Sequence, residues 1–293
     1  MTPSMKTALV SGAAGLLGRA TVDALADSGV EVHALVRSPE QAFRDDVAFH
    51  PVDLAAGLQR SDLPAQVDTV FHLAQAREFR DFPGSALPVF AINVASTAFL
   101  LDYATGAGTS SFVYASSGGV YRGASTALTE ESALQDPSAL GYYLATKLSS
   151  EALVASYASQ FSTVALRYFF IYGPGQARSM LIPRLYDRVQ AGEPLGLQGD
   201  DGMHINPIHS SDAAAATIAA AALQGGATVN VAGPETVSLR DIGELFAADS
   251  GRDAVFEQGA GVPSDLVAST ARMSELLVAP TVTLRDALTD IRP

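Results

Sequence analysis

The strongest constraint on the fold is a strand–glycine–helix sequence near the N-terminus, Thr7-Ala-Leu-Val-Ser-Gly-Ala-Ala-Gly-Leu-Leu-Gly18. Apolar residues that suit a buried strand lead directly into three glycines, and an amphipathic segment follows over residues 19–28. Glycines at such a turn let backbone N–H groups approach a pyrophosphate, and the helix N-terminus adds unpaired donors and a partial positive charge. The strand before the glycines and the helix after them favour a dinucleotide site over a plain structural turn.

Strand and helix patterns alternate through the rest of the first half of the chain. Strand patterns lie at residues 30–36, 47–52, 67–74, 111–116 and 163–171, and helical patterns lie at 88–106 and 142–161. This alternation predicts an α/β fold with a doubly wound parallel sheet, the Rossmann fold. Ligands of such sheets bind beyond the carboxyl ends of the strands, so the chemistry is expected just after Val10, Val36, Leu73, Ala115 and Phe169.

From Tyr172 onward the pattern changes, because glycine and proline recur. We predict a dinucleotide-binding domain over residues 1–173 and a smaller mixed substrate-binding domain over residues 174–293. Asp212 is expected to cap an alanine-rich helix, and this helix, over 212–224, is expected to pack back on the first domain. Ser238 is expected to cap a helix that ends near Ser250.

Composition narrows the function classes. The 293 residues carry a net charge of −13, which argues against binding to nucleic acid or an anionic membrane. The chain has no cysteine, which excludes disulfides and thiolate chemistry and fits a cytoplasmic protein. No uninterrupted apolar run reaches the roughly 18 residues of a membrane helix. His204 and His209 match no dense ligand spacing, so no metal is expected.

Three further motifs line up with the predicted strand ends. Tyr143 and Lys147 lie four residues apart, on one face of a helix, where an ammonium would lower the pKa of the phenol and allow proton exchange near neutral pH. Ser116 and Ser117 end a strand, where a hydroxyl can hydrogen-bond a substrate oxygen. The aromatic run 167–174 can pack against a flat ring. Taken singly, the first two could be an ordinary surface pair and a polar turn.

Together these motifs resemble the extended short-chain dehydrogenase/reductase family, which includes nucleotide-sugar epimerases, dehydratases and reductases. The resemblance covers nearly the whole chain. It rests on Gly12-x-x-Gly15-x-x-Gly18, Phe71-His72-Leu73-Ala74, Asn93-Val94 with Thr97, Ser116-Ser117, Tyr143-x-x-x-Lys147 and Tyr172-Gly173-Pro174.

The resemblance implies three catalytic residues. Tyr143 exchanges a proton with a substrate hydroxyl or ketone, Lys147 lowers the pKa of Tyr143 and holds the nicotinamide ribose, and Ser117 hydrogen-bonds the same substrate oxygen. The implied cofactor-binding residues are Gly12, Ala14, Gly15, Leu16, Leu17, Gly18, Arg37, Ser38, Asp53, Leu54, Leu73, Ala74, Asn93, Ser116, Tyr143, Lys147, Tyr168 and Phe169. The implied substrate-binding residues are Gln75, Ser117, Gly118, Tyr143 and Phe170. His72 is expected to be a packing residue.

The end of the second strand bears on the choice of cofactor. NAD-binding versions of this fold usually place an acidic residue there, where this chain has Val36 followed by Arg37. An arginine can clamp a 2′-phosphate through a bidentate charge-assisted hydrogen bond. We therefore expect NADP rather than NAD. The alternative is that Arg37 stacks on the adenine and discriminates little.

Several positions depart from the family pattern. Gly118 and Gly119 replace the Asp-Glu pair of the dehydratases, so dehydration is not expected. Phe170 replaces an asparagine common in nucleotide-sugar enzymes, and residues 203–206 replace a basic pair. Both departures weaken the case for a nucleotide sugar. The arginines Arg178, Arg184 and Arg188 could receive a pyrophosphate or simply be solvated.

The sequence therefore predicts an NAD(P)-dependent enzyme that transfers hydride at a secondary alcohol or ketone. The expected small-molecule substrate is a nucleotide-activated sugar, acted on by a 4-epimerase or 4-ketoreductase. One alternative is an NADPH-dependent ketoreductase of a non-sugar metabolite. Another is a non-catalytic NADP-binding sensor or scaffold. By resemblance, the helices over 88–106 and 142–161 could pair across a homodimer interface.

Overall fold

A computed structural model describes residues 5–124 and 126–293. The chain forms two compact units. Unit 1 comprises Met1–Val120, Leu134–Arg167 and Ala214–Val229, and unit 2 comprises Tyr121–Ala133, Tyr168–Ala213 and Asn230–Pro293. The division differs from the one expected at residue 173, since the chain enters unit 2 at Tyr168 and makes an earlier excursion at Tyr121–Ala133. No sequence pattern marks that excursion.

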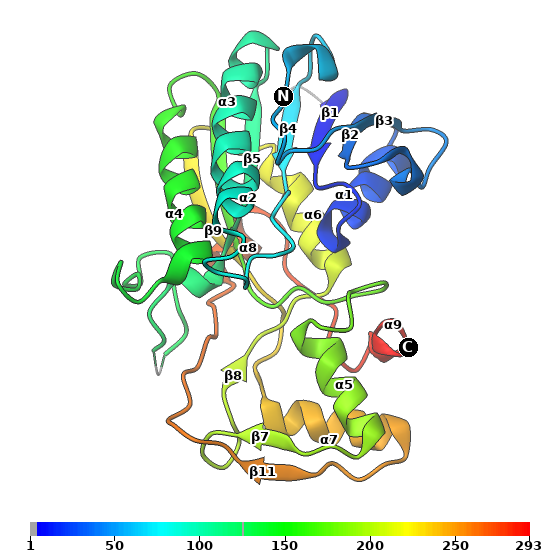
Figure 1. The fold of residues 1–293 in the computed structure, drawn as a ribbon, viewed down its shortest axis with the longest axis vertical. Helices are drawn as coiled ribbons and strands as arrows, with labels where there is room; N and C mark the ends of the chain where they lie inside the picture. Colours follow the sequence, from blue (N-terminus) through cyan, green and yellow to red (C-terminus); the bar gives the residue numbers. More distant parts are fainter. Residues whose placement is uncertain (1–4, 125) are drawn as a thin grey trace. The chain divides into compact units, whose positions relative to one another are not determined.

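A seven-stranded sheet is the centre of unit 1, and its strand order is β3-β2-β1-β4-β5-β6-β9 (Figure 1). The pairs formed among β1 to β5 are parallel, as in the predicted doubly wound fold. The strand order reverses between β1 and β4, which makes the carboxyl ends of these two strands the expected ligand crevice. The strands are β1 (Thr7–Ser11), β2 (Glu31–Val36), β3 (Ala48–Pro51), β4 (Thr69–His72), β5 (Ser111–Ser117), β6 (Ser162–Tyr168) and β9 (Gly226–Val231).

The central strands are buried on both faces, which explains their continuous apolar sequences. Every residue of β4 and β6 is buried, and so is every residue of β5 except the last. Side chains that point to one face, among them Leu9, Val70 and Phe112, form a core cluster with Leu100 and Leu101. A sheet covered on both faces cannot show the alternating pattern of a half-exposed strand.

The helices of the sheet domain follow the predicted order. They are α1 (Leu16–Asp27), α2 (Ala86–Phe90), α3 (Ser96–Gly106), α4 (Gly141–Ser156) and α6 (Ser210–Ala220). Helices α3 and α4 contact each other and run side by side across the sheet (Figure 1). Asp212 lies inside the first turn of α6 and not at its cap, so that prediction is wrong. Its carboxylate instead accepts hydrogen bonds from the backbone N–H groups of Thr281 and Val282, at 2.6 and 2.8 Å.

Helices α2 and α3 are joined without a break by a π-helical turn, η3 (Ala91–Ala95). The whole stretch Ala86–Gly106 has 21 residues and a mean hydropathy of 1.4 over its most apolar 18, so by length and composition alone it could span a membrane. The sequence pattern did not reveal it because Asn93 and Asp102 interrupt the apolar run. In the fold, Leu100, Leu101 and Ala104 belong to the core of unit 1.

Unit 2 is built around helices α5 (Leu181–Ala191) and α7 (Leu239–Ser250), whose apolar faces share a core that includes Ile182, Tyr186 and Phe246. Ser238 caps α7 as predicted, because its hydroxyl accepts from the Asp241 N–H at 3.0 Å. The remaining elements are the paired strands β7 (Leu195–Leu197) and β11 (Phe256–Gln258), the paired strands β8 (His204–Ile205) and β10 (Val237–Ser238), and the short helices α8 (Ala271–Leu276) and α9 (Leu288–Ile291).

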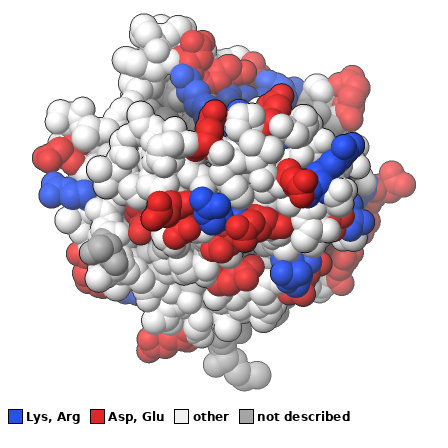
Figure 2. Space-filling model, turned by 90° about the horizontal axis from the view of Figure 1, so that it is seen from below, with Lys and Arg blue, Asp and Glu red and all other residues white. Residues whose placement is uncertain are grey.

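Acidic side chains are prominent on the surface. Figure 2 shows Asp and Glu spread over one face with Lys and Arg between them, in keeping with the net charge of −13. Any anionic ligand would therefore have to be held by local donors and not by the field of the whole protein.

Candidate active site

The glycine turn packs directly against the loop that follows β4. Gly12 has a φ of 72°, a conformation that favours glycine, and a Cβ there would lie 2.7 Å from the Ala74 backbone. A Cβ on Gly18 would lie only 2.1 Å from the Gly12 carbonyl oxygen. These two glycines thus allow the first turn of α1 to lie against β1 and the 73–74 backbone at the point where the strand order reverses.

The N-terminus of α1 is open to a ligand. Gly15 occupies the N-cap position, and no side chain caps the helix. Gly15 is exposed, and a Cβ there would meet only the Gly12 carbonyl oxygen, at 3.1 Å. The first N–H groups of α1 are therefore available to an anion, and the turn fits the pyrophosphate of a dinucleotide. The flanking residues Ala14 and Leu16 are partly exposed, while Leu17 packs inward.

The loop after β2 presents the predicted specificity residue. Val36 is buried, whereas Arg37 is exposed and its guanidinium has no partner among the described residues. The side chain of Gln41 accepts from the Arg37 N–H at 2.8 Å and from the Ser38 N–H at 3.3 Å. The turn is thus fixed through its backbone while the Arg37 guanidinium stays available to a ligand.

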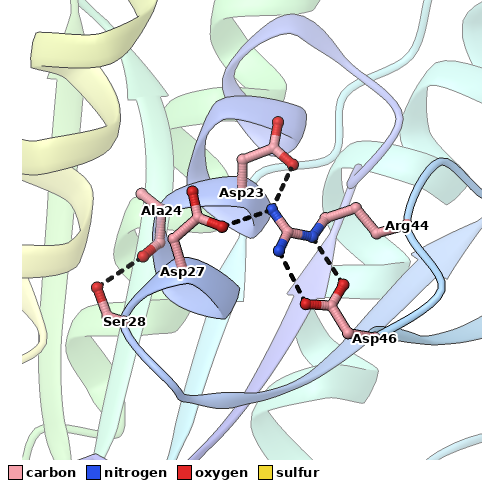
Figure 3. A network of polar contacts seen from close by, with 6 residues as sticks. All are labelled: Asp23, Ala24, Asp27, Ser28, Arg44 and Asp46. Atoms are coloured by element: carbon pink, nitrogen blue, oxygen red, sulfur yellow. Dashed lines mark hydrogen bonds and ion pairs between the residues drawn. The ribbon is translucent and has the colours of Figure 1, made fainter.

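The same loop is tied to α1 by a charged cluster (Figure 3). Arg44 binds Asp46 through two N–H···O contacts of 2.8 Å and binds Asp27 at 2.9 Å and Asp23 at 3.3 Å. These hydrogen bonds raise the pKa of the Arg44 guanidinium and lower that of the Asp46 carboxyl. This cluster holds the Arg37 loop against α1, the helix whose N-terminus has no side-chain cap.

Two of the predicted cofactor-binding residues, Asp53 and Leu54, lie after β3. Asp53 is exposed, and its carboxylate accepts from the Ala55 N–H at 3.0 Å. Leu54 is partly buried and packs against the core cluster of unit 1. Leu54 thus also has a structural role.

A buried chain of hydrogen bonds runs from the glycine turn through His72. The Thr97 hydroxyl donates to the Asn93 carbonyl at 2.7 Å, so it can only accept from His72 Nε2, at 2.9 Å. His72 therefore carries its proton on Nε2, and the Ser11 hydroxyl donates to Nδ1 at 2.6 Å. Complete burial lowers the pKa of His72 to about 3, with the Lys147 charge acting in the same direction. His72 is a neutral connecting residue.

Asn93 continues this chain into the tyrosine helix. Its side-chain oxygen accepts from the Ala76 N–H at 3.1 Å, and its amide donates to the Thr146 hydroxyl at 2.9 Å. Thr146 in turn donates to the Tyr143 carbonyl at 2.6 Å. Asn93 lies in the π-helical turn, a type of distortion that is frequent at functional sites. Asn93 thus supports the site from behind and joins the 73–76 loop to α4.

Ser117, Tyr143 and Gln75 converge beyond the ends of β5 and β4. The Tyr143 hydroxyl donates to Gln75 Oε1 at 2.9 Å. The Ser117 hydroxyl accepts from the Gly119 N–H at 3.2 Å and lies near enough to the Tyr143 hydroxyl to act on its pKa. Gly118, another predicted substrate contact, is buried in the 3₁₀ turn Gly118–Val120. A substrate oxygen placed next to the Tyr143 hydroxyl would replace Gln75 Oε1 as the acceptor of the phenol proton.

Lys147 lies behind the tyrosine and is fully enclosed. Its ammonium donates to the Ala115 carbonyl at 2.8 Å and lies 5.9 Å from the centre of the Tyr143 ring. Burial lowers the pKa of Lys147 to about 7, and the Glu151 carboxylate opposes this shift. An amine poised near neutrality can change its charge during a reaction.

The expected lowering of the Tyr143 pKa is not found. Desolvation raises it to about 12, and the hydrogen bond from Ser117 opposes the rise. The phenol is partly exposed, yet the protein displaces enough water to disfavour the phenolate. The ammonium of Lys147 is directed at the Ala115 carbonyl and not at the phenol oxygen, which accounts for the difference.

Ser116 points away from the reacting groups. Adjacent residues of a strand face opposite sides, and the Ser116 hydroxyl donates to the Glu151 carboxylate. The Ser116 side chain is therefore engaged by Glu151, and the predicted cofactor contact of Ser116 stays a prediction that its backbone would have to meet. The same alternation turns Ser117 toward Tyr143.

Three predicted ligand contacts belong to unit 2. Tyr168 and Phe169 are buried, and the Phe169 N–H donates to the Val231 carbonyl at 3.0 Å. Phe170 has a φ of 47° and packs against the core of unit 2. That left-handed conformation suits asparagine better than phenylalanine. The packing of Phe170 gives it a structural role beside the predicted one.

The arginines of unit 2 are mostly engaged. Arg178 binds Asp187 and the Ile291 carbonyl, and Arg188 donates to the Pro194 carbonyl at 2.6 Å. Arg184 is exposed. His209 and His204 each contact one aspartate, at 3.1 and 3.2 Å. Within residues 5–124 and 126–293, no three His, Asp or Glu side chains gather to hold a metal ion.

The sequence did not reveal the polar groups that support the trio of Ser117, Tyr143 and Lys147. Glu151, Arg167, Thr146 and Ser11 were not singled out. Glu151 had a readable signal, because it follows Lys147 by four residues and so lies on the same face of α4. Arg167 had a weaker one, as a charged residue within an apolar strand.

Comparison with known proteins agrees with this geometry. The family model described as "NAD dependent epimerase/dehydratase family" matches residues 8–232. The chain is 31% identical to the uncharacterized UDP-glucose epimerase YtcB of Bacillus subtilis, over 76% of this chain and 73% of that protein. It is 27% identical to the dTDP-4-dehydro-6-deoxy-D-allose reductase of Streptomyces bikiniensis, over 93% of this chain and 90% of that one. The solved structure of MoeE5 with UDP-glucuronic acid and NAD is 30% identical, with a TM-score of 0.82 and 97% coverage of both chains.

Proposed function

Because this chain belongs to the NAD-dependent epimerase/dehydratase family, we propose that it transfers hydride at C4 of a nucleotide-activated sugar. The observation that carries the proposal is the convergence of Ser117 and Tyr143 on one point next to an open glycine turn, with Lys147 behind them. The YtcB, MoeE5 and allose-reductase relatives are named for, or bound to, nucleotide sugars, which supports the substrate class.

The residues of the trio have separate roles in this proposal. Tyr143 takes the proton of the C4 hydroxyl during oxidation and returns it during reduction. Ser117 donates a hydrogen bond to the same oxygen and so stabilises the charge that develops on it. Lys147 holds the nicotinamide ribose in this proposal, and its ammonium favours the phenolate form of Tyr143 once it turns from the Ala115 carbonyl toward the phenol. When bound, a nicotinamide would accept the hydride during oxidation and donate it during reduction.

Epimerase and ketoreductase differ in the fate of that hydride. An epimerase returns it to the other face of the same sugar, whereas a ketoreductase consumes reduced cofactor once per turnover. The B. subtilis relative is named as an epimerase and the S. bikiniensis relative as a reductase. We therefore propose the shared chemistry and let one experiment choose between the two.

The experiment uses UDP-glucose and UDP-glucuronic acid deuterated at C4. An epimerase yields the C4 epimer with the deuterium retained, which NMR detects without any net change in nicotinamide absorbance. A ketoreductase instead oxidises NADPH with a 4-keto nucleotide sugar. Tyr143→Phe should lower either rate by at least about 10²-fold while cofactor binding is retained.

The outcomes separate the alternatives. Turnover of a simple ketone but of no nucleotide sugar would favour the non-sugar ketoreductase. Cofactor binding without turnover of any substrate, in a protein insensitive to Tyr143→Phe, would favour a sensor or scaffold.

We also propose NADP as the preferred cofactor, on the basis of the exposed Arg37 and the absence of an acidic residue at Val36. MoeE5 contains NAD, which points the other way. The dissociation constants of both cofactors for the wild type and for Arg37→Ala decide the matter. If Arg37→Ala loses affinity for NADP but not for NAD, the proposal that Arg37 binds the 2′-phosphate is supported. If each protein binds NADP and NAD with equal affinity, the proposal is refuted.

A homodimer is proposed through the apolar helix α2. Leu87 is 81% exposed and Phe90 is 47% exposed, so two large apolar side chains of α2 are in contact with water. A second copy of the chain would cover them. Light scattering should give a dimer for the wild type and a monomer for Leu87→Asp, and a monomeric wild type would refute the proposal.

A further inference from the structure

A buried ion pair lies behind the catalytic lysine, on the side away from the tyrosine. Tyr143, Lys147 and Glu151 follow one another at intervals of four residues, so all three lie on one face of α4. Arg167 of β6 meets Glu151 with a two-pronged contact, Nε to Oε1 at 3.0 Å and Nη2 to Oε2 at 2.7 Å. The side chains of Arg167 and Glu151 are only 8% and 12% exposed.

Strand β5 makes hydrogen bonds to both Lys147 and Glu151. Lys147 donates to the carbonyl of Ala115, and the next residue, Ser116, donates its hydroxyl to the Glu151 carboxylate. The carboxylate therefore has three donor contacts from two strands and cannot swing away from the lysine. A buried ion pair is costly to form, and nothing in the glycine turn or the trio itself requires this one.

Among the described residues, Lys147 has few other charged or titratable neighbours. The Tyr114 ring lies 5.2 Å from its ammonium, and His72 is neutral. The groups that face it from the elements packed around it are Tyr143 and Glu151 of α4, Tyr114 of β5, His72 of β4 and Arg167 of β6. Of these, only Glu151 is a carboxylic side chain.

We propose that Glu151, fixed by Arg167 and Ser116, is a positioning residue that keeps the buried Lys147 side chain charged next to Tyr143. Desolvation favours the neutral amine, and the carboxylate favours the ammonium. Arg167 has a second role, because its charge offsets that of Glu151 and limits how strongly the carboxylate acts on Lys147. The balance leaves Lys147 close to its titration point at neutral pH.

The composition of the chain makes a direct measurement possible. The sequence contains only two lysines, Lys6 and Lys147, among 18 basic residues. Protein labelled with ¹³C at the lysine ε-carbon therefore gives two resonances, and exposed Lys6 serves as an internal comparison. Their chemical shifts are followed from about pH 5 to about pH 10, with and without NAD, which gives the pKa of Lys147 without any assay of turnover.

Three variants separate charge from packing. Glu151→Gln keeps an oxygen for Ser116 and Arg167 but removes the charge, and it should lower the Lys147 pKa by about one unit or more. Arg167→Gln keeps a donor for Glu151 and should not lower it. Ser116→Ala removes a hydrogen bond without changing any charge and should leave it within about 0.3 units, and thermal melting confirms that each variant is folded.

The result that overturns the proposal is equally specific. An unchanged Lys147 pKa in Glu151→Gln refutes it, and so does an equal fall in Arg167→Gln or Ser116→Ala, since that pattern indicates loosened packing. If Glu151→Gln does not fold, Glu151→Asp takes its place, because its shorter side chain draws the carboxylate back from the lysine. If the Lys147 pKa falls in Glu151→Asp and keeps its wild-type value in Arg167→Gln, the charge effect is supported. If the Lys147 pKa is unchanged in both variants, the proposal is refuted.

The consequence for catalysis rests on the proposed function. The fraction of Lys147 that is charged falls as the pH rises through its pKa, so the alkaline limb of kcat/KM should move to lower pH in Glu151→Gln by the shift seen in the titration. A titration that moves while the rate profile does not leaves the role of Glu151 standing and refutes the role of Lys147 in the proposed reaction.

Discussion

The three glycines of the opening turn look equivalent in the sequence, but the structure predicts three different consequences for their substitution. A Cβ on Gly18 would lie 2.1 Å from the Gly12 carbonyl oxygen, which is a backbone atom and cannot rotate away. Relieving that contact requires a shift of about 1 Å between α1 and the turn, an overpacking that costs about 1–3 kcal/mol. At roughly 2–4 °C per kcal/mol for a chain of this size, Gly18→Ala should lower the melting temperature by roughly 2–12 °C.

Gly15→Ala is the matched comparison. Its φ is not in the left-handed region, and its Cβ meets only one atom, at 3.1 Å, so the folded state should barely be affected. Gly15 is exposed at the N-cap of α1, where a methyl group would stand between the first N–H groups and a bound pyrophosphate. Its melting temperature should match the wild type, while its cofactor dissociation constant should rise about tenfold, or about 1.4 kcal/mol.

Thermal melting and cofactor titration by nicotinamide fluorescence check both effects in the same preparations. If Gly15→Ala binds the cofactor as tightly as the wild type, the turn does not hold the phosphates. If Gly18→Ala melts at the wild-type temperature, the close approach of α1 to Gly12 is not a real constraint.

Three further outcomes follow from particular side chains. Because the pKa of His72 falls from an ordinary value of 6.5 to about 3 on folding, the unfolded chain binds more protons below pH 6.5, and the protein should lose about 2 kcal/mol of stability between about pH 7 and about pH 5. Urea unfolding at the two pH values tests this, and a His72→Asn variant with the same pH dependence would rule out His72 as its source. Arg44→Ala leaves Asp23, Asp27 and Asp46 without their shared cation. The melting temperature of this variant should fall at low salt and recover partly at about 0.5 M NaCl, because salt screens the repulsion between the carboxylates. A loss of melting temperature that does not depend on salt would show that the cluster does not act electrostatically. Replacing Gln75 by Leu removes the acceptor of the Tyr143 proton and should raise KM more than it lowers kcat if Gln75 only stands in for the substrate oxygen, and a larger loss in kcat would instead make Gln75 part of the chemistry.

The fold was predictable because its signals are local. The glycine turn, the continuous apolar strands and the cap at Ser238 each depend on a few adjacent residues. The strand positions were found to within a few residues for the same reason. The excursion of Tyr121–Ala133 into unit 2 and the π-helical turn at Ala91–Ala95 were not predicted, since both depend on contacts between segments far apart in the chain.

The candidate site shows the same division. Tyr143 and Lys147 could be placed on one face of a helix by spacing alone, and Ser117 could be preferred to Ser116 by its match to the family motif. The direction in which each hydroxyl points was decided by the sheet, whose alternation turns Ser117 toward Tyr143 and Ser116 toward Glu151.

The order of residues along the chain was enough to specify which elements form and which residue types meet at the carboxyl ends of the strands. The charge states of those residues depend on the folded protein. Burial raises the pKa of Tyr143, lowers that of Lys147 and keeps His72 neutral, because desolvation depends on everything packed around a group and not on its neighbours in the chain. The ion pair of Glu151 and Arg167, brought together from a helix and a strand, follows from the fold in the same way.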